Sequence, residues 1–136
     1  MNILIIDAKG GGLGKQLVTV IKRNVEEAVI TAAGTNSLAT EAMRKAGADN
    51  AATGENAIIV CSRNADIIVG SVGIAMADTM GGEITPAIAL AICKSRAKRI
   101  FLPMNQQDSI FVGLADLTIK ELMNAVVEEI RAWNDL

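Results

Sequence analysis

Four glycines lie close together near the start of the chain, at positions 10, 11, 12 and 14. They follow a short apolar run and precede apolar residues at helical spacing, which is the pattern of a strand that leads through a loop into a helix. Glycine lets the backbone approach a ligand, and the helix start adds about half a positive charge beside the free amides. We therefore expect this loop to bind a phosphate group.

The stretch from Asp7 to Val18 resembles the T-G-x-x-x-G-[IL]-G loop of the short-chain dehydrogenase/reductase superfamily. Residues 12–14, Gly-Leu-Gly, match the closing part of that loop, whereas Asp7 and Ala8 replace its opening Thr-Gly. The resemblance implies NAD or NADP as the cofactor, with another adenine nucleotide as the alternative. It does not imply reductase chemistry, because the superfamily's Tyr-x-x-x-Lys pair is impossible in a chain without tyrosine.

Other interpretations of the same loop remain open. Gly14 and Lys15 are similar to the end of a deviant P-loop, but Gln16 stands where that motif needs Ser or Thr to hold Mg²⁺. Lys15 also stands where a strict G-x-G-x-x-G motif needs its last glycine. A glycine-rich turn that only allows a helix to pack tightly on a sheet is the structural alternative.

Side chains for acid–base chemistry are few. The absence of histidine and tyrosine excludes Ser-His-Asp and Cys-His nucleophile systems and most zinc sites. Glu83 is the candidate catalytic residue; it precedes a Thr85-Pro86 helix start, so a purely electrostatic role at that helix is the alternative. Asp7 would repel a neighbouring phosphate unless Mg²⁺ or a ribose hydroxyl intervenes. No metal site is expected.

Hydrophobic periodicity predicts the elements that position these residues. The first two strands are expected at residues 2–7 and 28–33, followed by a short one at 48–53 and two more at 65–70 and 99–103. Helices are expected to begin near Leu13, Asn36, Pro86 and Thr118, the last through a capping box. Residues 55–64 are predicted to be a short helix for a topological reason, because the next strand needs a crossover before it to stay parallel.

The alternation of strands and helices predicts a single doubly wound α/β domain over residues 1–136, a three-layer Rossmann-like fold. Its parallel sheet is expected in the order 3-2-1-4-5. About six residues separate the strand at 99–103 from Ile110-Phe111-Val112, which is too few for a parallel crossover. We therefore predict a sixth, antiparallel strand at the edge of the sheet.

Ligands of open α/β sheets bind beyond the carboxyl ends of the strands, near the point where the strand order reverses. This rule gathers the loop residues after strands one, two, four and five into one candidate site, with Asp78 and Glu83 in the long connection 71–84. The candidate binding residues are Asp7, Lys9, Gly10, Gly11, Gly12, Leu13, Gly14, Thr35, Asn36, Ser71, Gly73 and Asn105, with Gln106 and Gln107 beside the last. Thr35 and Asn36 stand where an acid would bind the adenosine ribose; helix capping is their alternative role.

Over its full length the chain resembles a small bacterial family of Rossmann-like proteins that is known only as a domain of unknown function. The shared stretches are residues 5–15, 34–40, 47–49, 53–57 and 81–87. The resemblance implies the fold and brings no activity.

Charge and hydropathy limit the possible partners. The 13 basic and 15 acidic residues leave a net charge of −2, and aromatic residues make up 2% of the chain. Nucleic acid is therefore not expected as a partner. No apolar stretch approaches the length of a membrane helix, so we expect a cytoplasmic protein.

The sequence thus predicts a protein that binds a nucleotide or dinucleotide of the NAD(P) type, with any reaction unidentified. A non-enzymatic regulatory or assembly module is the alternative, since no acid–base pair is recognisable. We also expect a homodimer or homotetramer, because an edge strand at 110–112 and Trp133 near the end of the last helix would leave apolar surface exposed. Trp133 either anchors that interface or closes its own core.

Overall fold

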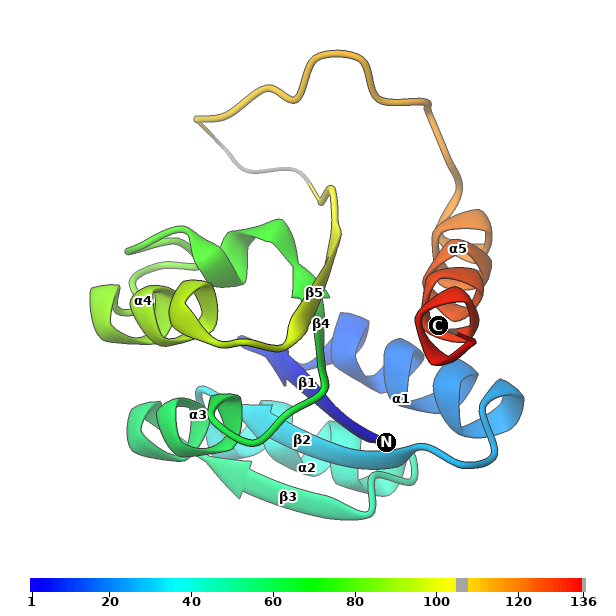
Figure 1. Ribbon diagram of the computed structural model, residues 1–136. Helices are drawn as coiled ribbons and strands as arrows, with labels where there is room; N and C mark the ends of the chain where they lie inside the picture. Colours follow the sequence, from blue (N-terminus) through cyan, green and yellow to red (C-terminus); the bar gives the residue numbers. More distant parts are fainter. Residues whose placement is uncertain (105–107, 136) are drawn as a thin grey trace.

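A parallel sheet of five strands forms the centre of the computed structural model, which describes residues 1–104 and 108–135 (Figure 1). The strands are β1 (Asn2–Asp7), β2 (Val29–Gly34), β3 (Asn50–Thr53), β4 (Ile67–Ser71) and β5 (Lys98–Leu102). Their order is β3-β2-β1-β4-β5, and every pair is parallel. The predicted fold class and strand order are confirmed.

In the described ranges, four helices and one 3₁₀ turn connect these strands, and a fifth helix follows the last strand. They are α1 (Gly12–Asn24), α2 (Ser37–Lys45), α3 (Glu55–Ser62), η1 (Val72–Ala75), α4 (Pro86–Lys94) and α5 (Ile119–Asn134). The predicted caps are present: the Asn36 side chain accepts the Ala39 N–H, and Thr118 and Glu121 form a capping box. The short helix predicted at 55–64 is also found. None of the helices in the described ranges is both long and apolar enough to cross a bilayer.

The helices cover both faces of the sheet. Apolar residues of α1, α2 and α5 pack with the side chains of Ile3, Ile5 and Val69 on one face. Residues of α3, η1 and α4 pack with Leu4, Ile6 and other strand residues on the opposite face. Each fully buried Ile or Leu contributes about 1.5 to 3 kcal/mol. Strands buried on both faces explain why β1 and β4 are continuous apolar runs rather than alternating ones.

The prediction of a sixth, antiparallel strand at Ile110-Phe111-Val112 is wrong. These residues form no strand, and Ile110 and Val112 are 91% and 94% exposed. In Figure 1 this part of the chain stands clear of the sheet on its way to α5.

The direction of α5 explains the missing strand. The end of α5 lies beside the end of α1, where Arg131 Nη2 donates to Asn24 O (3.0 Å) and Asn134 Nδ2 donates to Glu27 Oε1 (2.8 Å). Because α5 runs in the direction of α1, it must begin at the carboxyl edge of the sheet, where β5 ends. An antiparallel strand would carry the chain away from that edge.

The register of the sheet aligns the carboxyl ends of β1 and β4, the two strands between which the strand order reverses. Ile5 of β1 pairs with Val69 of β4 and Asp7 pairs with Gly34 of β2. Continuing the first pairing by two residues places Ser71 beside Asp7. The first candidate residues therefore meet at one point of the carboxyl edge.

Candidate functional site

A cleft of about 850 Å³ opens at the carboxyl edge, between the ends of β1 and β4. It is walled by the glycine loop, by the connection after η1 and by residues that follow β5. The lining residues are Asp7, Lys9, Leu13, Ser71, Met76, Ala77, Asp78, Thr79, Met80, Gly81, Met104, Asp108 and Ser109. This is the place where open α/β sheets bind their ligands, and the volume is in the range of small-molecule sites.

Ser71 is the polar residue at the floor of this cleft. It is 4% exposed, and its Oγ is the one buried side-chain oxygen or nitrogen in the described part of the chain without a hydrogen-bond partner. A buried hydroxyl without a partner costs about 1 to 3 kcal/mol. Such a group beside a cleft has hydrogen-bonding capacity that no described residue uses.

Asp7 lies next to Ser71 and is 8% exposed. Its Oδ1 accepts the Ala8 N–H (2.8 Å), and its Oδ2 accepts the Gly14 N–H (2.6 Å). Burial raises the pKa of Asp7; these two hydrogen bonds oppose the rise and the negative charge of Glu83 adds to it. The carboxylate thus caps the first turn of α1 from the preceding strand, and its charge favours donor groups of a ligand over phosphate at this end of the cleft.

Two of the four loop glycines are required by the protein's own packing. Gly11 has a φ of +74°, and a Cβ there would lie 2.8 Å from Ala39 Cα in α2. A Cβ at Gly14 would lie 2.9 Å from Asp7 Cβ and equally close to Met43 Cγ. The predicted alternative of a tight turn for helix packing therefore accounts for Gly11 and Gly14.

Gly10 and Gly12 are different. Both are exposed, neither has a positive φ, and a Cβ on either would meet no atom within 4 Å. Within the described residues, the N–H groups of Gly12 and Leu13 also have no acceptor, because they belong to the first turn of α1. Lys9 lines the cleft beside them. These amides and the Lys9 ammonium form the part of the site suited to an anion.

Thr35 and Asn36 do not face the cleft; they bind Glu83. Glu83 Oε1 accepts the Lys9 N–H (2.9 Å), the Thr35 hydroxyl (2.7 Å) and an Asn36 Nδ2 hydrogen (2.8 Å). We call these four residues the Glu83 cluster. These hydrogen bonds lower the pKa of Glu83, and the one from the Lys9 N–H has the largest effect. The carboxylate therefore ties the connection after η1 to the glycine loop and to the end of β2, and it is not placed to act on a molecule in the cleft.

The pKa of Glu83 gives a prediction for stability. Because the folded-state pKa lies below the ordinary Glu value of 4.5, the charged carboxylate stabilises the fold above pH 4.5, and this contribution is lost as the pH falls below it. We expect Glu83→Gln to lower the free energy of unfolding by about 1 kcal/mol at pH 7. The difference from wild type should shrink in urea unfolding below pH 4.5. Glu128→Gln, on the exposed side of α5, is the control; a constant difference at all pH values would contradict the prediction.

The remaining predicted residues are spread around this centre. Gly73 is buried in η1, where its carbonyl accepts the Thr79 hydroxyl (2.6 Å). Gly10 lines a separate groove between α1 and α2. Asn105, with Gln106 and Gln107, lies outside the described residues. Among the described residues, no group of three or more acidic or Cys side chains comes together to hold a metal ion.

The sequence analysis missed several residues of the cleft wall. Met76, Thr79, Met80 and Gly81 come from the connection after η1, and Met104 follows β5. The sequence feature that indicated the loop residues among them was the glycine-punctuated connection in which they lie. Asp78 and Met80 adopt positive φ angles of 67° and 57° there, so the loop is bent into a shape that local propensity does not predict.

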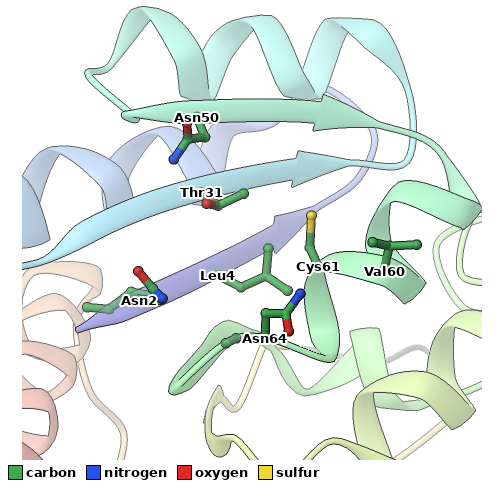
Figure 2. A pocket seen from close by; sticks show the side chains of 9 residues that line it. Asn2, Leu4, Thr31, Asn50, Val60, Cys61 and Asn64 are labelled. Atoms are coloured by element: carbon green, nitrogen blue, oxygen red, sulfur yellow. The ribbon is translucent and has the colours of Figure 1, made fainter.

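A second cavity, of about 310 Å³, lies at the opposite, amino edge of the sheet. Figure 2 shows Cys61 and Val60 of α3 facing the strands that carry Leu4 and Thr31. Burial raises the pKa of the Cys61 thiol, which disfavours the reactive thiolate. The lining contains no charged residue, and this edge is not where such sheets bind ligands. The carboxyl-edge cleft is therefore the candidate functional site.

Comparison with known proteins identifies the family of the chain but does not identify an activity. No curated protein and no solved structure matches the chain. The expected similarity to short-chain dehydrogenases/reductases is not supported by any match, so it rests on the glycine loop alone. One family model matches residues 2–135. The chain belongs to the family described as a domain of unknown function (DUF3842), and the fold described above is its parallel-sheet α/β structure.

Proposed function

We propose that this protein binds a nucleotide in the carboxyl-edge cleft, with its phosphate at the start of α1. The observation that carries the proposal is the buried, unpartnered hydroxyl of Ser71 in a cleft that is also lined by Leu13, whose free amide follows that of Gly12 in the first turn of α1. NAD or NADP is the ligand class that the glycine loop favours, and other adenine nucleotides are the alternative.

The polar groups of the cleft match the parts of a nucleotide. The amides of Gly12 and Leu13 and the Lys9 ammonium suit a phosphate. Asp7 and Ser71 suit ribose hydroxyls, since a carboxylate accepts and a serine hydroxyl both accepts and donates. The side chains of Leu13, Met76 and Met80 supply apolar surface for a base.

A ligand panel tests the proposal. Calorimetry and thermal shift with NAD, NADP, FAD, ATP, S-adenosylmethionine and coenzyme A should find at least one ligand that binds below millimolar concentration. Ser71→Ala should weaken that binding about tenfold and should stabilise the free protein by about 1 kcal/mol, because it removes an unpaired buried hydroxyl. Ser62→Ala is the matched control: Ser62 is buried too, but its hydroxyl donates to Ile58 O (2.7 Å), so its loss should cost stability and leave binding unchanged. Absence of binding by the whole panel would refute the proposal.

A second candidate function, a non-enzymatic assembly module, is favoured by the exposed segment of residues 110–118, which precedes α5. Its apolar side chains lack cover within the chain, and exposed apolar surface of this kind marks interaction sites. The exposed large apolar residues of this segment are Ile110, Phe111, Val112, Leu114 and Leu117, and the equally apolar Ile119 at the start of α5 is exposed beside them. Trp133, in contrast, is half-buried and packs against its own core. The segment, not the indole, is therefore the better anchor for a second copy of the chain.

Light scattering tests this assembly. We expect the wild-type mass to be two or four times the 14.2 kDa of one chain, and the double variant Ile110→Asp with Val112→Asp to be monomeric. Trp133→Ala should lose stability, by about 3 kcal/mol or less for a half-buried indole, without losing association. A wild-type mass near 14.2 kDa would rule out the oligomer.

A further inference from the structure

The half of the carboxyl edge that lies over β2 is occupied by the protein itself. The Asn36 side chain makes three hydrogen bonds: its Oδ1 accepts the Ala39 N–H (2.9 Å), and its Nδ2 donates to Lys9 O (3.0 Å) and to Glu83 Oε1 (2.8 Å). The Thr35 hydroxyl donates to the same Glu83 oxygen (2.7 Å). Both side chains that follow β2 are therefore already engaged, and Glu83 lies across them.

Backbone contacts close the same side. A Cβ at Gly11 would lie 2.8 Å from Ala39 Cα, so the glycine loop touches the start of α2 directly. Gly34, the last residue of β2, is equally enclosed, because a Cβ there would lie 2.6 Å from Thr40 N. At Gly11 and Gly34 there is therefore no space for a sugar or a base between the glycine loop, the end of β2 and the start of α2; the separate groove lined by Gly10 lies beyond these contacts, along α1 and α2.

The other half of the edge is open. Every lining residue of the 850 Å³ cleft comes from β1, the glycine loop, the start of α1, β4, the connection after η1, or the segment after β5. None comes from β2 or α2. The unpartnered Ser71 hydroxyl and Leu13, with its free amide, belong to this open half, and the free amide of Gly12 precedes that of Leu13 in the first turn of α1.

A dinucleotide bound to a sheet of this order spans the point where the order reverses, with its adenosine on the β2 side. In this protein that side is closed by the Glu83 cluster and by Gly11. We propose that the cleft accepts a ligand with a single nucleotide unit, a mononucleotide rather than a dinucleotide. The inference rests on the proposed binding of a nucleotide, and it replaces the dinucleotide class that the glycine loop favours with a mononucleotide. The one phosphate lies at the Gly12 and Leu13 amides, and the nucleoside lies toward Ser71 and the two methionines Met76 and Met80.

Matched pairs of ligands test this inference by calorimetry. AMP and nicotinamide mononucleotide are the two halves of NAD, and FMN is one half of FAD. A site that holds both halves binds the whole dinucleotide on the order of tenfold or more tightly than either half. We expect instead that, in at least one pair, a mononucleotide binds the wild-type protein as tightly as the corresponding dinucleotide or more tightly.

Two variants at position 83 sharpen the test. Glu83→Ala removes the carboxylate that holds Thr35 and Asn36, so it should raise the affinity for the dinucleotide relative to its half about tenfold. Glu83→Gln keeps an oxygen acceptor and should retain the wild-type preference. Dinucleotide binding tenfold tighter than both halves in wild type, with no change in Glu83→Ala, overturns this inference and leaves the proposed function standing. Absence of binding by all the mononucleotides and dinucleotides overturns both.

Discussion

Gly11→Ala should lower the free energy of unfolding by about 3 kcal/mol or more, the largest loss of stability expected from any single methyl group in the glycine loop. Two costs combine. An alanine at a φ of +74° is strained by about 1 to 2 kcal/mol. Its Cβ would also lie 2.8 Å from Ala39 Cα and 2.9 Å from Ala39 O, and these backbone atoms cannot rotate away. Thermal unfolding should show a midpoint about 10 °C or more below wild type.

Gly12→Ala is the matched control for this prediction. The residue is adjacent, but it lies at the first position of α1 with ordinary helical φ and with open space around its Cβ position. Replacing such a glycine by alanine restricts the unfolded chain, so stability should stay unchanged or rise by up to about 1 kcal/mol. Equal stability of the two variants would contradict the packing of the glycine loop against α2.

Gly12→Val should abolish nucleotide binding, with a loss of about 100-fold or more, while the fold stays intact. The valine methyl groups would fill the open space beside the free amides of Gly12 and Leu13, where the proposed phosphate lies. A surface position with free space tolerates such a change within about 0.5 kcal/mol of stability. Calorimetry with the ligand found for the wild type measures the loss, and urea unfolding confirms the unchanged stability.

A second valine variant serves as the control for Gly12→Val. Thr19→Val lies on the exposed side of α1, away from the cleft, where Thr19 bonds only the Lys15 carbonyl of its own helix (2.8 Å). It should leave nucleotide binding unchanged. If Gly12→Val bound the ligand as tightly as wild type, the glycine loop would have only the packing role that Gly11 and Gly14 already have.

Local sequence signals explain how much of the fold was predictable. Continuous apolar runs such as residues 3–6 favour strands buried on both faces, which are typical of a parallel sheet with helices on either side. Capping residues such as Asn36 and Thr118 define helix starts through hydrogen bonds to residues three positions away. These signals depend on neighbours along the chain, so the capped helix starts and the strands of the parallel sheet were predicted correctly. The helix at 55–64 and the strand order followed instead from the rules for parallel crossovers and doubly wound sheets.

The prediction of a sixth strand was wrong because the strand propensity came from neighbouring residues, whereas the conformation of this segment depends on distant ones. Ile110-Phe111-Val112 is a β-branched and aromatic run that favours a strand in isolation. Whether it forms one depends on where α5 must begin, and that is decided by the packing of α5 along α1. The exposed residues of this segment follow from that long-range constraint.

The position of the candidate site in the fold was predictable from the sequence, but the contacts of its residues were not. Parallel strands bring their carboxyl ends to one edge, so the sequence alone determined that Asp7 and Ser71 would lie near each other and that the glycine loop would lie beside them. The sequence alone also determined the absence of His and Tyr chemistry.

Only the tertiary structure decided which role each of these residues has. Glu83 changed from candidate catalyst to the centre of a hydrogen-bonded cluster, because the connection after η1 bends back through the positive φ angles of Asp78 and Met80. Gly11 and Gly14 differ from Gly10 and Gly12 through their contacts with α2 and β1, and Gly11 differs also through its positive φ. The physical reason is common to these cases: residue type and spacing set what a side chain can do, whereas its partners come from other segments of the chain, such as Ala39 for Gly11 and Glu83 for Thr35, and only packing brings those together.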